Sequence, residues 1–110
     1  WVTWVAREDS GRLVASVRAR AVPGAPSGHT WEIGRLMVAP DLQGRGLGRR
    51  LLEHAESMAP REATAIALLT GAANEVNQRR YRRAGYRRSA PERLLLPPVE
   101  GAIEFVKRRR

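Results

Sequence analysis

The stretch from Trp31 to Ala59 constrains the fold of this 110-residue chain more than any other part of the sequence. It contains an apolar extended segment over residues 31–38, a glycine-rich loop from Gln43 to Gly48, and a helical pattern up to Ala59. The first backbone N–H groups of a helix have no partner within the helix, and glycines let a ligand approach the backbone closely. The sequence therefore predicts that a phosphate group binds at this loop.

The spacing of the glycines separates this loop from two other phosphate-binding loops. A Walker loop has Lys and then Ser or Thr after its last glycine, whereas Gly48 is followed by two arginines, which disfavours nucleotide hydrolysis. A dinucleotide-binding fingerprint requires a third glycine at the position that Arg49 occupies. A plain flexible turn before an amphipathic helix is the remaining alternative.

The hydrophobic patterns predict one α/β (α+β) domain over residues 1–110. The predicted strands cover residues 1–7, 12–21, 31–38, 64–70, 86–96 and 102–107, with a loop at 22–30 and helices after the glycine loop and at 75–83. The first two strands form a hairpin, and the helix between the strands at 31–38 and 64–70 implies that these two are parallel. Asn74 is expected to cap the second helix and Gly85 to end it.

Composition limits the classes of partner. Lys and Arg outnumber Asp and Glu by 20 to 11, and the net charge of +9 favours an anionic partner such as a phosphorylated cofactor. Nucleic-acid binding is a weaker alternative, because no recognised motif accompanies the arginines. With no cysteine and two distant histidines, neither a disulfide nor a metal site is predicted. No apolar run reaches the roughly 20 residues that a membrane helix needs, so we expect a cytoplasmic protein without membrane contact.

The glycine loop and its surroundings resemble motif A of the GNAT superfamily of acetyl-CoA-dependent N-acetyltransferases. That pattern has Gln or Arg, two residues, Gly, one residue, and then Gly or Ala, and Gln43, Gly46 and Gly48 occupy its fixed positions. A second match lies downstream, where Asn74 and Tyr81 are similar to the family's asparagine after the fifth strand and the tyrosine of the following helix. The resemblance covers nearly the whole chain.

The resemblance implies a GNAT-like, mostly antiparallel twisted sheet with helices on its faces and a central strand–glycine loop–helix–strand crossover. The family's fold begins with one strand and two helices that help to wall the acceptor site. The resemblance implies that this sequence starts after those elements, so we expect a core that is incomplete at its N-terminal side.

The resemblance also implies transfer of an acetyl group from acetyl-CoA, as cosubstrate, to a primary amine by direct attack in a ternary complex. The acceptor would be a small molecule or a peptide or protein amine. A GNAT-like module that binds acyl-CoA without catalysis is the main alternative. Many members of the family are dimers, so a homodimer is also open to this chain.

In the family, the glycine loop holds the pyrophosphate, and the preceding strand runs beside the pantetheine arm and polarises the thioester carbonyl. The cofactor-binding residues that the resemblance implies here are Leu36, Met37, Val38, Gln43, Gly44, Arg45, Gly46, Leu47, Gly48, Arg49 and Asn74. For Asn74, a pantetheine contact and a plain helix cap are both compatible with the sequence.

Two residues are predicted to take part in catalysis. Glu32 has the placement of the catalytic glutamate in histone acetyltransferases of this superfamily, and strand alternation puts it on one face with Leu36 and Val38. Its alternatives are a surface carboxylate paired with an arginine, or deprotonation of the amine through ordered water. Tyr81 is predicted to protonate the leaving thiolate, because a phenol with a pKa of about 10 suits that role, and simple packing is its alternative.

Overall fold

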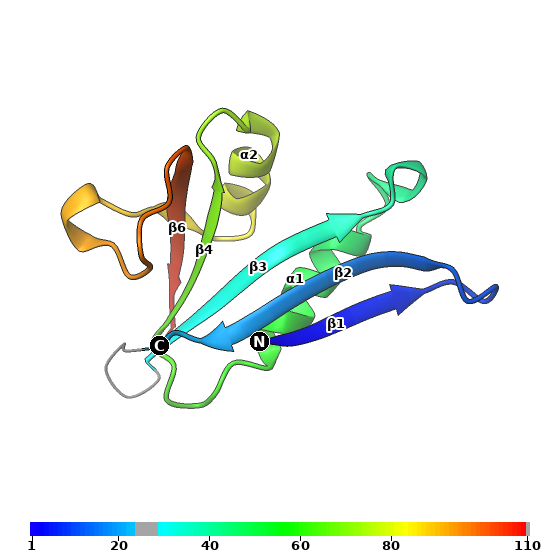
Figure 1. Ribbon diagram of the computed structural model, residues 1–110, viewed down its shortest axis with the longest axis horizontal. Helices are drawn as coiled ribbons and strands as arrows, with labels where there is room; N and C mark the ends of the chain where they lie inside the picture. Colours follow the sequence, from blue (N-terminus) through cyan, green and yellow to red (C-terminus); the bar gives the residue numbers. More distant parts are fainter. Residues whose placement is uncertain (24–28, 110) are drawn as a thin grey trace.

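The computed structural model describes residues 1–23 and 29–109, and within them six strands form one mixed sheet with two α-helices (Figure 1). The strand order is β1-β2-β3-β4-β6-β5. The strands are β1 (Val2–Arg7), β2 (Leu13–Ala21), β3 (Thr30–Val38), β4 (Ala65–Gly71), β5 (Arg87–Arg88) and β6 (Ala102–Arg108). The helices are α1 (Leu47–Ser57) and α2 (Glu75–Arg83), and short 3-10 turns occupy Pro40–Leu42 and Pro91–Arg93.

The topology confirms the predicted mixed, mostly antiparallel sheet. β1 and β2 form the predicted hairpin, and β3 pairs in parallel with β4 across the α1 crossover. The pairs β2–β3, β4–β6 and β5–β6 are antiparallel. Residues 24–28 of the predicted loop lie outside the described residues.

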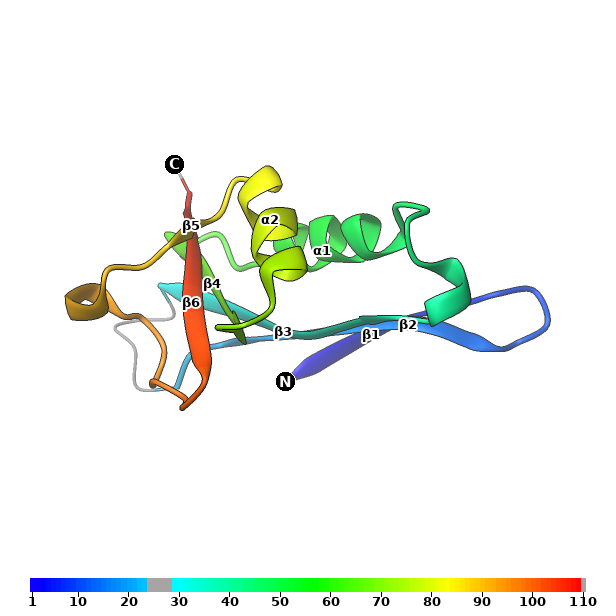
Figure 2. The ribbon, with the colours of Figure 1, turned by 90° about the horizontal axis from the view of Figure 1, so that it is seen from above.

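The two helices lie on the same face of the sheet (Figure 2). Between them and the strands is the main core, to which α1 contributes Leu51, Leu52 and Ala55 and α2 contributes Tyr81. The indole nitrogen of Trp31 donates a hydrogen bond to the carbonyl of Ala55 at 2.9 Å, which fixes α1 on β3. We call this the helix face, and the opposite one the second face.

The residues predicted to start and to end the second helix do so. Asn74 caps α2, since its side-chain oxygen accepts a hydrogen bond from the N–H of Asn77 at 3.0 Å. At the other end Gly85 has φ +98°, and the N–H of Tyr86 bonds the carbonyl of Tyr81 at 3.0 Å. This is the arrangement of a Schellman C-cap. The first helix ends at Ser57, two residues before the predicted Ala59.

The predicted strand over residues 86–96 is wrong apart from the two residues of β5. The buried carboxylate of Glu104 accepts hydrogen bonds from the side chain of Ser89 and from the N–H groups of Leu95 and Leu96. These amides are therefore satisfied by a side chain rather than by a neighbouring strand. Pro91 also starts a 3-10 turn, so the segment folds back over the second face at Ala67.

β3 contains a bulge that the sequence alternation does not show. Arg35 has φ +50°, and the register between β2 and β3 shifts between Ser16 and Arg18. Leu36 packs against the main core with Trp31 and Ile33, so Glu32 lies on the second face. The prediction that Glu32 shares a face with Leu36 and Val38 is therefore wrong, because the extra residue reverses the alternation.

Candidate active site

The glycine loop connects β3 to α1 and exposes the first backbone amides of the helix. Gly44 has φ +82° and Gly46, the N-cap residue, has φ +79°, conformations that glycine adopts without steric cost. The first hydrogen bond of α1 runs from the N–H of Arg50 to the carbonyl of Gly46 at 3.0 Å. The N–H groups of Leu47 to Arg49 therefore precede the first helical hydrogen bond, at the positive end of the helix dipole.

Two contacts hold the loop against the end of β3. The side-chain nitrogen of Gln43 donates to the carbonyl of Val38 at 3.3 Å. A Cβ on Gly48 would lie only 3.3 Å from Cγ2 of Val38, so the glycine allows α1 to start close to the strand. Both residues therefore have a structural role in shaping the loop.

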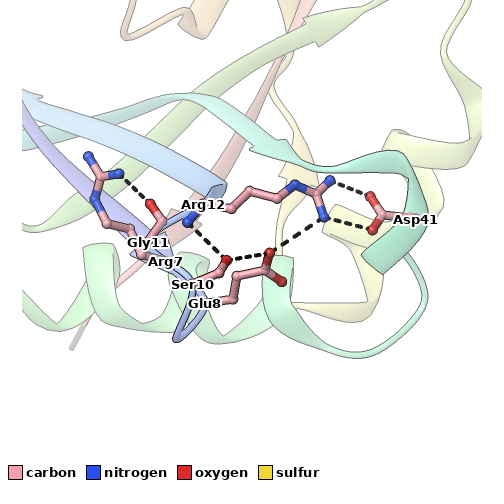
Figure 3. Close-up of polar contacts among 6 residues, drawn as sticks. All are labelled: Arg7, Glu8, Ser10, Gly11, Arg12 and Asp41. Atoms are coloured by element: carbon pink, nitrogen blue, oxygen red, sulfur yellow. Dashed lines mark hydrogen bonds and ion pairs between the residues drawn. The ribbon is translucent and has the colours of Figure 1, made fainter.

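An ion pair fixes the turn that leads into the loop (Figure 3). The guanidinium of Arg12, immediately before β2, binds both carboxylate oxygens of Asp41 at 2.7 and 2.9 Å. The hydrogen bond from Arg12 is the main cause that lowers the pKa of Asp41 to about 2, and the charge of Arg45 acts in the same direction. The Pro40–Leu42 turn is thus tied to the β1–β2 hairpin.

Two adjoining hollows run from the glycine loop between α1 and α2. The first, of about 130 Å³, is lined by Val38, Leu42, Gln43, Gly44, Gly46, Leu47, Gly48, Arg49 and Arg80. The second, of about 260 Å³, is lined by Leu36, Gly48, Arg49, Leu52, Arg80, Arg83 and Ala84. Because Gly48, Arg49 and Arg80 belong to both, we treat them as one interhelix groove.

The groove brings together most of the predicted cofactor-binding side chains and adds two arginines. Arg80 and Arg83, one turn apart on α2, were not predicted as site residues. Their spacing of three, which places them on one side of a helix, is the signal that would have found them. Leu36 reaches the groove because the bulge turns it to the helix face.

Three predicted cofactor-binding residues have side chains outside the interhelix groove. Met37 is 64% exposed and lines a separate hollow with Val14 and Ser16. The side chain of Arg45 is exposed on the loop. The side-chain oxygen of Asn74 is used for the helix cap, so its contact with a pantetheine arm stays a prediction.

β3 and β4 separate immediately beside Glu32. Their pairing ends at Glu32 and Ala67, and Figure 1 shows the two strands diverging from there. Among the residues that the structure describes, the part of β3 that contains Leu36 to Val38 therefore has a backbone edge without a strand partner on the β4 side. Such an edge can receive an extended ligand in the way it would receive another strand.

Glu32 is half-buried and paired with an arginine. Nε of Arg20 donates to Oε1 of Glu32 at 3.0 Å across the β2–β3 pair. In the described part of the chain, Oε2 of Glu32 has no hydrogen-bond partner. The arginine pairing anticipated for Glu32 is thus present, and the role as general base stays a prediction.

Tyr81 is buried on the helix face. It packs edge-on against Tyr86 at 6.0 Å between ring centres and lies 6.4 Å from Phe105. Burial raises the pKa of Tyr81, and the nearby charge of Arg80 opposes this in part, so the phenol keeps its proton at neutral pH. Across residues 1–23 and 29–109 its hydroxyl forms no hydrogen bond. The packing interpretation is correct in itself, and proton donation by Tyr81 stays a prediction.

In the part of the chain that the structure describes, no helix has the length and apolar character needed to cross a membrane.

The sequence of the chain is similar to a known protein family and to a curated relative. The sequence model of the Acetyltransferase (GNAT) family matches residues 1–86. A curated relative, mycothiol acetyltransferase from Cellulomonas flavigena, is 37% identical over 105 residues, which cover 86% of this chain and 29% of that protein. The chain therefore spans less than a third of the length of this relative.

Solved structures share the fold at low sequence identity. An acetyltransferase of the GNAT family from Staphylococcus aureus has a TM-score of 0.82 at 15% identity, with coverage of 96% of this chain and 66% of that one. The PaiA N-acetyltransferase of Thermoplasma acidophilum, solved in complex with coenzyme A, has a TM-score of 0.71 at 16% identity, with coverage of 93% and 57%.

Proposed function

Because the chain belongs to the Acetyltransferase (GNAT) family, we propose that it transfers an acetyl group from acetyl-CoA to a primary amine. The observation that carries this proposal is the glycine loop at the start of α1, which opens into the interhelix groove. Amides at a helix N-terminus together with Arg49 and Arg80 form a suitable site for a pyrophosphate.

The groove also suits the rest of the cofactor. A pantetheine arm would run from the loop along Leu36 to Val38, where β3 has no partner on its β4 side within the described ranges 1–23 and 29–109. Backbone amides of this segment would then bond the arm and polarise the thioester carbonyl. Asn74, the N-cap residue of α2 shortly after β4, would donate its side-chain N–H₂ group to the arm while its oxygen caps α2.

The chemistry needs one proton acceptor and one proton donor. The amine nitrogen attacks the thioester carbon, its proton passes to Glu32 directly or through water, and the carbon–sulfur bond breaks. Tyr81 then gives its proton to the departing thiolate. Glu32 lies on the second face where the pairing of β3 with β4 ends, and Tyr81 lies on the helix face, so the two substrates would meet between the strands.

Binding and turnover test this proposal separately. Calorimetry with acetyl-CoA measures the first, and release of free thiol over a panel of amines measures the second, with an amine-free reaction as control. Because the curated relative is named for mycothiol, small thiol conjugates that carry an amine belong in the panel, and for these the mass of the acetylated product replaces the thiol readout. Absence of acetyl-CoA binding would contradict the proposal, and tight binding without turnover on any amine would favour a non-catalytic acyl-CoA module.

A further inference from the structure

Three side chains form a basic cluster on the second face, next to Glu32. The guanidinium carbons of Arg18 and Arg20 lie 4.0 and 4.3 Å from the ring centre of Trp1, which is the distance of a cation–π contact. On β2, Arg18 is opposite Gly34 and Arg20 is opposite Glu32. The Trp1 cluster (Trp1, Arg18 and Arg20) therefore covers the rows of the sheet at which β3 leaves β4.

Among the described residues, the Trp1 cluster contains two positively charged side chains but contacts only one carboxylate, that of Glu32. Arg20 is paired with Glu32, but the side chain of Arg18 takes part in no ion pair or hydrogen bond among residues 1–23 and 29–109. Nε of Arg18 is fully enclosed and has no partner there. Because Nε is enclosed, an added anion would reach Arg18 through its two terminal guanidinium nitrogens. These nitrogens also have no acceptor among the described residues, and the anion would supply one.

The position of Arg18 suits recognition of the acceptor rather than of the cofactor. The interhelix groove lies on the helix face, whereas the Trp1 cluster lies on the face of Glu32. Arg18 is opposite Gly34, which is two residues from Glu32 along β3 and therefore on the same face. Two residues of a strand span roughly 7 Å. If the amine of an acceptor lies at Glu32, the guanidinium of Arg18 can therefore contact another group of the same acceptor that is several bonds from the amine.

We propose that Arg18, oriented by stacking on Trp1, binds a carboxylate of the acceptor, which makes the acceptor an amine that also carries a carboxylate. This inference rests on the proposed acetyl transfer, since Glu32 defines where the amine lies. Guanidinium groups bind carboxylates through two parallel hydrogen bonds, and the stacking contact fixes the plane of the group in advance. The substrate class is therefore ω-amino acids and short peptides, in which several bonds separate the amine from the carboxylate.

Matched acceptors test the inference in the wild-type protein. Each ω-amino acid or dipeptide of a length series is compared with its own carboxamide, so that only the negative charge differs. We expect kcat/KM to be higher for the carboxylate by about tenfold or more, as for a charge-assisted hydrogen bond. Equal kcat/KM for carboxylate and carboxamide throughout the series would overturn the inference.

Two substitutions assign the preference to Arg18. In Arg18→Gln the ratio of kcat/KM between carboxylate and carboxamide should fall to about one, and in Arg18→Lys it should be partly retained. Arg7→Gln is the matched control, because it removes the same charge from the same sheet at the distant hairpin turn, where Arg7 bonds the carbonyl of Gly11. An unchanged ratio in Arg18→Gln would overturn the assignment.

A binding measurement separates this inference from the proposed function. Calorimetry of the CoA-saturated protein with an ω-amino acid requires no turnover. If no amine is acetylated, the proposed function fails, yet carboxylate binding that is lost in Arg18→Gln and kept in Arg7→Gln still supports the subsite. Equal carboxylate affinity in the wild type and Arg18→Gln would overturn it.

Discussion

Glu32 and Leu36 lie on opposite faces of the sheet, although they are four positions apart on one strand, a spacing that regular alternation would put on the same face. The bulge at Arg35, with φ +50°, accounts for this. Leu36 lines the interhelix groove, whereas Glu32 contacts Arg20 on the second face. One strand thereby offers a backbone edge to the proposed cofactor and a carboxylate to the proposed acceptor, on either side of the gap between β3 and β4.

The first prediction concerns Glu32 as the proton acceptor. Glu32→Gln should lower kcat at neutral pH by on the order of 100-fold, because the amide cannot accept the amine proton. The dissociation constant of acetyl-CoA should change far less, since Glu32 does not line the groove. Glu62→Gln, an exposed glutamate before β4, is the control. A pH–rate profile identical to that of the wild type would exclude the role.

The second prediction separates proton donation by Tyr81 from packing. Tyr81→Phe keeps the buried ring and removes the hydroxyl, so turnover should fall on the order of tenfold or more while acetyl-CoA affinity is retained. Tyr86→Phe is the matched control. Its hydroxyl donates to Glu56 at 2.7 Å, so this variant should lose about 1–2 kcal/mol of stability and keep its turnover. Wild-type turnover in Tyr81→Phe would leave only a packing role.

Signals confined to a few neighbouring residues predicted their structures well. The glycine loop, the cap at Asn74 and the terminating Gly85 depend on backbone geometry that their own residue types favour. The two main errors involve residues distant in sequence. The segment after Tyr86 is held by hydrogen bonds to the carboxylate of Glu104. The bulge at Arg35 places a non-glycine residue at positive φ, a conformation that an arginine in the sequence does not predict.

The candidate site shows the same division. The loop residues were found from their spacing, because the backbone amides and the glycines lie within one short segment. Arg80 was not predicted as a site residue, because its position in the groove depends on how α2 packs beside α1. The Trp1 cluster was likewise not predicted, because its position beside Glu32 depends on the register between β2 and β3, which the bulge shifts.

The third prediction concerns the left-handed glycine at the N-cap of α1. Gly46→Ala should cost about 1–2 kcal/mol of stability and also weaken acetyl-CoA binding, because the loop amides lose their alignment. Gly101→Ala is the matched control: Gly101 has φ +78° and Gly46 has φ +79°. Apart from the chain neighbours of each glycine, no described residue has an atom within 4 Å of a Cβ added at either position. The two variants should lose similar stability, and only Gly46→Ala should bind acetyl-CoA more weakly. Equal affinities would contradict a role of this loop in binding.

The fourth prediction concerns Arg80, which lines both parts of the groove. Arg80→Gln should weaken acetyl-CoA binding by about tenfold and make the affinity less sensitive to salt, because one charge facing the phosphates is lost. Arg79→Gln removes the same charge from the neighbouring position, which does not line the groove. Titrations at several salt concentrations measure both effects. Equal affinity losses in the two variants would indicate a general effect of net charge instead.

The fifth prediction concerns pH and the pair of Arg12 and Asp41. The pKa of Asp41 is lowered to about 2 in the folded protein, chiefly by the hydrogen bond from Arg12. In the unfolded chain an aspartate has a pKa of about 3.9, so the folded state binds this proton less readily. The pair therefore stabilises the fold above about pH 4, and this contribution is lost as the pH falls through about 2.

Denaturant unfolding of a double-mutant cycle measures this effect. Asp41→Asn and Arg12→Gln, alone and combined, give the coupling free energy between the two side chains at each pH. The coupling should be present at about pH 6 and should vanish as the pH approaches about 2, because protonated Asp41 no longer attracts the guanidinium. The turn tied by this pair leads into the glycine loop, so Asp41→Asn should also weaken acetyl-CoA binding at neutral pH. A coupling that does not change with pH would show that the contact acts through packing rather than through charge.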